Sequence, residues 1–146
     1  MCVNYAPLQR KILREIFLVE PPEDDWRLET WPDYAAPIVR ANGDGKRESI
    51  LASFGMIPKD KIPEGVRPFD TCNARSETVG EKRSFSGAWK KGQMCLVPAS
   101  AIYEPNYEHG PRSVRHKLWL TDEPAFGIAG LWRDWPDGAA SFTMLT

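Results

Sequence analysis

Apolar residues near the start of the chain recur at helical spacing. Pro7 is followed by leucine, isoleucine and phenylalanine side chains every three to four residues up to Leu18. Proline is tolerated in the first turn of a helix, and the spacing is typical of a helix with one buried face. The pattern therefore predicts a helix from Pro7 to about Leu18.

The pattern then changes to short apolar runs separated by turn residues. Residues 36–40 and 48–54 flank an Asn-Gly-Asp-Gly sequence, which predicts a β-hairpin. Prolines between positions 58 and 68 predict an extended surface loop, and residues 84–91 predict one or two helical turns. Further strands are expected at residues 94–97, 101–104, 116–120, 126–131 and 141–146. One early helix followed by many short strands predicts an α+β domain built mainly on antiparallel sheet.

A length of 146 residues predicts one domain, residues 1–146, with its own core. Three tryptophans, Trp89, Trp119 and Trp132, are expected in that core. The sequence stops at Thr146 inside an apolar run, so we expect it to lack a C-terminal portion. No apolar run approaches the roughly 20 residues of a membrane span, and no signal pattern is visible, so we expect a cytoplasmic protein with no membrane partner.

Charge is uneven along the chain. The net charge is −1, but residues 71–117 hold eight Lys+Arg against four Asp+Glu, whereas the flanking segments are acidic. This distribution suits a short anionic ligand better than a long duplex, although the charges could equally well face water. The three cysteines show no CxxC spacing, and neither His109 nor His116 pairs with a cysteine. We expect no metal site, no disulfide framework and no cofactor.

The second residue is a cysteine, and this position favours one kind of chemistry. If Met1 is removed, Cys2 carries a free α-amine beside its own thiol. The amine titrates near ~8 and the thiol near ~8.5, so part of each is nucleophilic at neutral pH. An amine condenses with an aldehyde to an imine, and a neighbouring thiolate can close a thiazolidine ring. The alternative is a buried cysteine that acts only as a small apolar residue.

Two later segments carry further candidate residues. If residues 71–78 form a strand, Asn73, Arg75 and Glu77 share one face, and the arginine could bind a phosphate. The alternative is an exposed polar loop. Glu104 ends an apolar run, where partial burial would make it a proton donor near neutral pH. It could also mark only the point where a strand reaches solvent.

Three stretches resemble the motifs of one family. They are Met1-Cys-Val-Asn, Asn73-Ala-Arg-Ser-Glu-Thr78 and Cys95-Leu-Val-Pro-Ala-Ser-Ala-Ile-Tyr-Glu104. Members of the SOS response-associated peptidase (SRAP) family begin Met-Cys-Gly-Arg. They carry Asn-Ala-Arg-x-Glu-Thr centrally and a Cys-Leu-x-Pro-Ala-x-Gly-Phe-Tyr-Glu-Trp-type motif later. Phe54-Gly-Met-Ile-Pro and Phe142-Thr-Met-Leu-Thr146 resemble two further family stretches. The chain is therefore similar to this family along its whole length.

The resemblance implies a curved, barrel-like sheet and a covalent sensor of abasic sites in single-stranded DNA. Cys2 would form a thiazolidine with the ring-opened deoxyribose, Asn73 would hydrogen-bond near the amine, and Glu104 would protonate the sugar oxygen. Arg75 would bind phosphate, and Phe54, at the position of a family tryptophan, would stack on a base. The implied context is DNA damage and the SOS response. Exposing Cys2 requires removal of Met1 by an aminopeptidase or by the protein itself, so hydrolase, protease or lyase activity would follow from a competent site.

The sequence departs from the family pattern at several positions. Asn4 replaces an arginine, Val3 a glycine and Pro105 a tryptophan. The family's His-x-Arg-Met-Pro motif does not occur in these residues, and neither of the two histidines matches it. Asn4 and Thr146 complete the expected DNA contacts.

These departures leave other functions open. One alternative is a catalytically degenerate module that binds single-stranded DNA or a small anion. A less supported one is a cysteine hydrolase with Cys72 as nucleophile, because Cys72 would face away from Asn73 on a strand.

Overall fold

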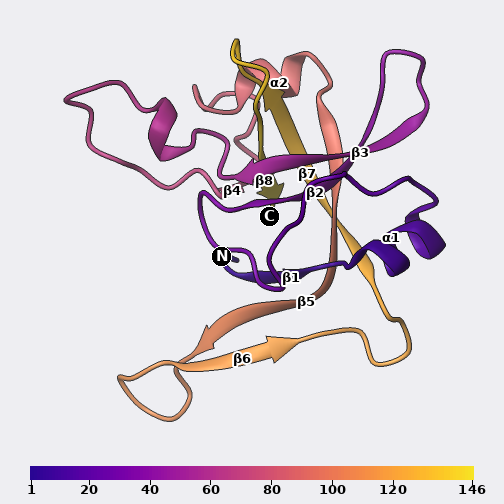
Figure 1. Ribbon diagram of the computed structural model, residues 1–146. Helices are drawn as coiled ribbons and strands as arrows, with labels where there is room; N and C mark the ends of the chain where they lie inside the picture. The colour runs from indigo at the N-terminus through magenta and orange to yellow at the C-terminus, as the bar shows by residue number, and fades with distance from the viewer.

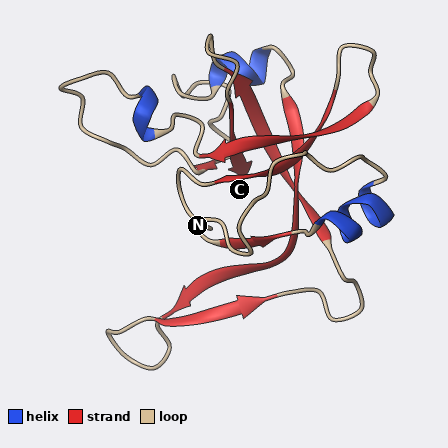
Figure 2. Cartoon of the chain, viewed as in Figure 1, coloured by secondary structure: helices blue, strands red, loops and turns tan.

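Five strands pair in a closed circuit. In the computed structural model, which describes residues 1–146, β5 pairs with β2, β2 with β3, β3 with β8, β8 with β7, and β7 again with β5. All these pairs are antiparallel except β3 with β8 (Figures 1 and 2). The strands are β1 (Tyr5–Pro7), β2 (Ala35–Ala41), β3 (Arg47–Phe54), β4 (Asn73–Ala74), β5 (Met94–Asn106), β6 (Val114–Leu118), β7 (Phe126–Asp134) and β8 (Ala140–Leu145). The predicted α+β fold with a barrel-like antiparallel core is confirmed.

Three short helices flank this circuit: α1 (Arg10–Phe17), the 3-10 helix η1 (Lys59–Lys61) and α2 (Ser86–Lys90). Leu13 and Phe17 bury one face of α1, which confirms the predicted amphipathic helix. The helix begins later than expected because Pro7 belongs to β1, where it pairs with Ala99 of β5. It ends at Phe17, and the next residue, Leu18, has a left-handed backbone and donates its N–H to the carbonyl of Arg14. Neither α1 nor α2 has the length and apolar character that crossing a membrane demands.

β5 is a single long strand where the sequence predicts two. The expected break covers residues 98–100 and begins at Pro98, which cannot donate a ladder hydrogen bond. Along one edge β5 pairs with β2 at Leu96 and with β1 from Ala99 onward, so Pro98 lies between the two partners. Its carbonyl accepts a hydrogen bond from Leu8 on that edge, so its nitrogen faces the same gap. The missing N–H therefore interrupts neither pairing.

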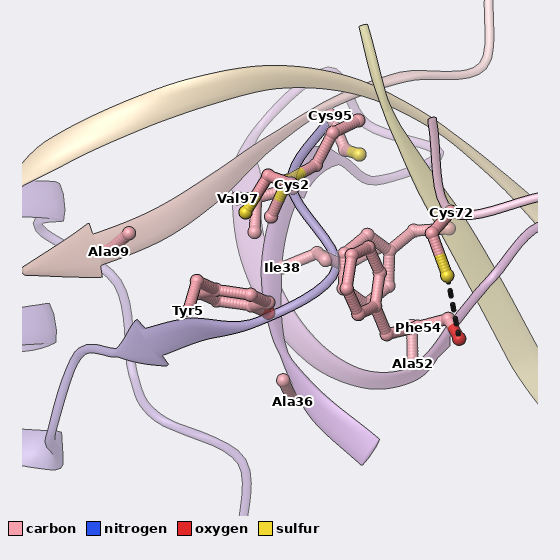
Figure 3. Packing of buried hydrophobic residues seen from close by; sticks show 12 residues of the cluster. Cys2, Tyr5, Ala36, Ile38, Ala52, Phe54, Cys72, Cys95, Val97 and Ala99 are labelled. Carbon is pink, nitrogen blue, oxygen red and sulfur yellow. Dashed lines mark hydrogen bonds between the residues drawn. The ribbon is translucent and has the colours of Figure 1, made fainter. Parts of the chain in front are cut away.

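The main core lies inside the circuit of strands. The Phe54 and Phe142 rings stack at 5.2 Å between centroids, and Tyr5 meets Phe54 edge-on at 5.5 Å. All three cysteines belong to this cluster, including Cys2 from the N-terminal segment (Figure 3). The N-terminus is thus part of the core, which fixes the first residues against the barrel.

The β5–β6 hairpin extends away from the barrel (Figure 1). All five residues of β6 are exposed. The strand covers 114–118 instead of the expected 116–120, because its register is set by pairing with the far half of β5, where Ile102 faces Leu118.

The expectation that three tryptophans are in the core is wrong for two of them. Trp119 follows β6 on the projecting hairpin and is 59% exposed, and Trp89 on α2 is 41% exposed. Trp132 packs against the main core under the Arg40 guanidinium, 4.0 Å from its ring.

Candidate functional site

The N-terminal segment runs beside β5 and places Cys2 at the edge of the core. Tyr103 of β5 donates its backbone N–H to the carbonyl of Asn4 at 3.0 Å. The Cys2 thiol donates to the same carbonyl at 3.3 Å and is 7% exposed. The sulfur is therefore held in one place before any ligand arrives.

Burial raises the pKa of the Cys2 thiol above its ordinary value. The negative charge of Glu104 raises this pKa further, whereas the positive N-terminal amine acts in the opposite direction. The thiol is consequently protonated at neutral pH in the chain that retains Met1.

Glu104 lies directly beside the N-terminus. Its Oε2 is 3.6 Å from the Met1 amine, and its side chain is 27% exposed. The residue belongs to the far half of β5, opposite His116 of β6. A carboxylate that is half-buried next to the terminal amine can accept a proton from it or donate one to a bound group.

Asn73 reaches the same place from β4. Its Nδ2 donates to the carbonyl oxygen of Cys2 at 2.7 Å. The position of Asn73 is set by parallel pairing with Met144 of β8. Its Oδ1 is buried and has no hydrogen-bond partner. A buried acceptor without a donor carries a free-energy cost, so this oxygen is free to accept an N–H from a ligand or from the Cys2 amine.

Arg75 and Thr146 lie together, but their contacts are separate from those of Cys2. β4 ends at Ala74 and the chain turns, so Arg75 and Glu77 do not continue a strand face with Asn73. The backbone N–H of Ser76 donates to the carbonyl of Thr146 at 2.9 Å. Arg75 is exposed, and it lines a surface hollow with Thr146.

Two of the expected DNA contacts are interior. Phe54 is fully buried between Tyr5 and Phe142, so its ring has no face open to a base. Asn4 is 2% exposed, and its Nδ2 donates to the carbonyl of Thr30 at 3.1 Å. The resemblance pointed to both positions but could not reveal that their side chains point inward.

The other two cysteines are structural. Burial raises the pKa of Cys95 to about 12. Burial is also the main cause that raises the pKa of Cys72, and the neighbouring Asp70 carboxylate raises it further. A thiol that stays protonated is a poor nucleophile, which opposes the hydrolase alternative based on Cys72.

Arg115 is a residue of this region that the sequence does not reveal. Its Nη2 donates to Asn4 Oδ1 at 2.6 Å and to Glu29 Oε2 at 2.7 Å. Arg115 and Asn4 are 111 positions apart, and no sequence motif links them. No periodicity or spacing could have indicated this contact.

Comparison with known proteins agrees with this arrangement of motifs. The profile of the SOS response associated peptidase (SRAP) family matches residues 1–146. The chain belongs to this family. A solved structure of a protein from Bordetella bronchiseptica superposes with a TM-score of 0.81 and 33% identity, covering 99% of this chain and 71% of that one.

Two curated relatives carry functional names. The abasic site processing protein YoqW of Bacillus subtilis (strain 168) is 28% identical over 109 residues, which are 73% of this chain and 48% of that protein. The abasic site processing protein HMCES of Rattus norvegicus is 39% identical over 54 residues, or 35% of this chain and 15% of that protein. This SRAP chain thus spans half or less of the length of these relatives.

Proposed function

We propose that this SRAP protein recognises abasic sites in single-stranded DNA and joins them covalently through Cys2. The observation that carries the proposal is the meeting of the Asn73 and Glu104 side chains, from distant segments, at the N-terminus that carries Cys2. Asn73 bonds the Cys2 carbonyl at 2.7 Å, and Glu104 lies 3.6 Å from the terminal amine. The family and the names of two relatives support abasic DNA as the target.

The first requirement is removal of Met1. Met1 as a whole residue is 71% exposed, so the terminal residue is open to an aminopeptidase. Its amine also lies 3.6 Å from Glu104, whose carboxylate would allow the protein itself to catalyse the removal. Once Met1 is removed, the positive amine belongs to Cys2, where it favours the thiolate more strongly than the amine one residue away.

The covalent step would then follow from the chemistry of a 1,2-aminothiol. The Cys2 amine adds to the C1′ aldehyde of the ring-opened deoxyribose, and loss of one water molecule gives an imine. The sulfur adds to the imine carbon as the nitrogen gains a proton, which closes the thiazolidine ring. The net reaction releases one water and needs no oxidant or cofactor.

Asn73 and Glu104 would take different parts in this reaction. The unpartnered Oδ1 of Asn73 would accept an N–H of the Cys2 amine and orient its lone pair toward the aldehyde. Glu104 in its protonated form would donate to the sugar ring oxygen, because only the open-chain form of the sugar reacts with an amine. Both roles require the Asn73 amide and the Glu104 carboxylate to lie near the N-terminus, and both groups contact it.

Arg75 is the candidate phosphate contact. Its guanidinium is exposed and lies next to Thr146. A single strand presents its phosphates and its abasic sugar together on a flexible backbone, whereas in a duplex the opposite strand covers part of the sugar. A single strand is therefore the better substrate.

The buried Asn4 favours a second candidate function, because the cation expected at that position is missing. In this alternative the protein binds single-stranded DNA or a small anion without reacting. The two functions make opposite predictions about covalent products.

The test compares two oligonucleotides of one sequence, with and without an abasic site. We expect intact-mass spectrometry to find protein without Met1 and an SDS-stable adduct with the abasic strand only. Its mass should equal protein plus DNA minus one water. Salt-sensitive binding to both strands with no adduct would instead support the non-covalent alternative.

A further inference from the structure

Arg115 joins four parts of the chain at one point beside the N-terminus. It lies on β6, and its guanidinium passes 3.8 Å from the ring of Tyr103 on β5. From there Nη2 donates to Asn4 in the N-terminal segment and to Glu29 in the loop before β2, at 2.6 and 2.7 Å. This side chain is the contact of β6 with the N-terminal segment, beside the contacts that β5 makes through Tyr103 and Glu104.

Asn4 connects Arg115 to Cys2 through hydrogen bonds. Its Nδ2 donates to the carbonyl of Thr30, and its side-chain oxygen is held by Arg115. Its own carbonyl accepts both the Cys2 thiol and the N–H of Tyr103. Because Asn4 is almost fully buried, water could hardly replace Arg115 as the hydrogen-bond partner of its side-chain oxygen. Arg115 thus holds the side-chain oxygen of Asn4, while Thr30 holds its amide nitrogen and Tyr103 its carbonyl.

The same contacts argue against a phosphate site at Arg115. The side chain is 48% exposed, but its charge is already paired with Glu29, and both hydrogens of Nη2 are used by protein oxygens. An incoming phosphate would compete with a carboxylate at 2.7 Å. A guanidinium that is bonded on one edge and stacked on an aromatic ring is suited to holding protein groups in place.

We propose that Arg115 is a positioning residue that fixes the N-terminal segment and thereby places the amine and thiol of Cys2 for reaction. It acts through Asn4 and has no contact with the substrate. The inference builds on the proposed function, because the reaction at Cys2 is what the positioning serves. Its physical part, that Arg115 immobilises Cys2, can be measured without any DNA.

The experiment compares Arg115→Ala and Arg115→Lys with Arg112→Ala. Arg112 is exposed in the turn before β6 and has no side-chain hydrogen bond or ion pair, so it is a matched control. The first readout is the rate at which iodoacetamide alkylates Cys2, followed by peptide mass spectrometry. We expect Arg115→Ala to raise this rate about fivefold or more, because the loosened segment exposes the sulfur. Arg115→Lys should lie between, and Arg112→Ala should match the parent protein.

The second readout is the adduct with abasic single-stranded DNA. Misplacement of a reacting group by about 1 Å can cost about 100-fold in rate. We expect a loss of about tenfold or more at saturating DNA in Arg115→Ala, with affinity for intact strand changed less than about twofold. Circular dichroism identifies any unfolded variant, and Arg115→Lys, which keeps the charge, decides the question in that case.

Two results would overturn the proposal. One is unchanged Cys2 alkylation in both Arg115 variants. The other is weakened DNA affinity with an unchanged rate at saturation, which would make Arg115 a phosphate contact. If the parent protein forms no adduct at all, the proposed function fails, while the alkylation rates still decide whether Arg115 holds Cys2 in place.

Discussion

Cys2 is the proposed nucleophile although it is buried, and burial ordinarily makes a thiol less reactive. It is buried in the core cluster, and this burial keeps its thiol protonated. Its reactivity therefore depends on charge supplied nearby, and the amine freed by loss of Met1 is the closest source. In the proposed reaction, this would give the residue a low background reactivity toward solutes and a high reactivity toward an aldehyde bound at its own amine.

Asn73→Ala tests the contact that aligns the N-terminus. The variant loses the 2.7 Å bond to the Cys2 carbonyl and the free Oδ1 acceptor. We expect the rate of adduct formation at saturating abasic DNA to fall about tenfold or more. Asn42→Ala is the control, because Asn42 is another hydrogen-bonded asparagine, whose side chain accepts two bonds within the β2–β3 turn and makes none to the N-terminus. Equal rates of adduct formation in the two variants would show that Asn73 takes no part in the reaction.

Arg75→Ala tests the phosphate contact. For single-stranded DNA each neutralised phosphate contributes about 0.7 to the slope of log affinity against log salt. We expect the slope for an intact oligonucleotide to shrink by about that amount, as measured by fluorescence anisotropy at several salt concentrations. Arg14→Ala on α1, whose arginine is paired with Glu20, should leave the slope unchanged. A slope unaffected by Arg75→Ala would show that this side chain is not in the DNA path.

At the scale of single elements, close approach of strands limits which residues fit. A Cβ added to Gly130 of β7 would lie 2.6 Å from the carbonyl oxygen of Thr143 on β8. This contact leaves no room for a methyl group between the paired strands.

We therefore expect Gly130→Ala to lower the free energy of unfolding by about 1–3 kcal/mol, through forced movement of β8. Gly87→Ala in α2 is the control, because a Cβ there meets nothing within 4 Å. It should raise the stability slightly, since alanine is the better helix former. Urea unfolding of both variants measures the difference, and equal stability would contradict the tight β7–β8 contact.

Element by element, the sequence predicted those parts of the fold that depend on local pattern. The hairpin of β2 and β3 follows from two short apolar runs around a strong turn sequence, and α1 follows from its apolar spacing. β1 and the length of β5 depend on pairing between distant segments, as in the contact of Tyr5 with Ile102. Such pairing leaves no local signal, which is why β5 was expected to break at Pro98.

The whole molecule brings together site residues that the sequence could only place in order. Cys2, Asn73 and Glu104 were candidates because motifs mark them, and their contacts with the N-terminus follow from the closed circuit of strands. Sequence alone could not separate buried from exposed side chains, so Phe54 was expected on the surface. Arg115 lacked any motif and became visible only through its contacts across β5.

The buried thiols also predict how stability depends on pH. In the unfolded chain they ionise near ~8.5, whereas burial raises the pKa of Cys95 to about 12 and raises the pKa of Cys2 and Cys72 as well. Above ~8.5 unfolding therefore releases protons, and the free energy of unfolding falls as pH rises. Below pH ~8.5 these thiols are protonated in both the folded and the unfolded chain, so they do not make the free energy of unfolding depend on pH.

Thermal melts between pH 7 and 10.5 should show this decline. Cys95→Ala removes one of the thiols, so its melting temperature should fall less steeply with pH than that of the parent protein. An identical slope in the two proteins would mean that Cys95 does not contribute to the alkaline loss.

The account depends most directly on Cys2 as the point of attachment. The decisive measurement incubates the parent protein, Cys2→Ala and Cys95→Ala with abasic single-stranded DNA and follows adducts on denaturing gels and by peptide mass spectrometry. We predict an adduct in the parent and in Cys95→Ala, with the modification on the N-terminal peptide, and none in Cys2→Ala. An adduct of unchanged yield in Cys2→Ala would contradict the central claim.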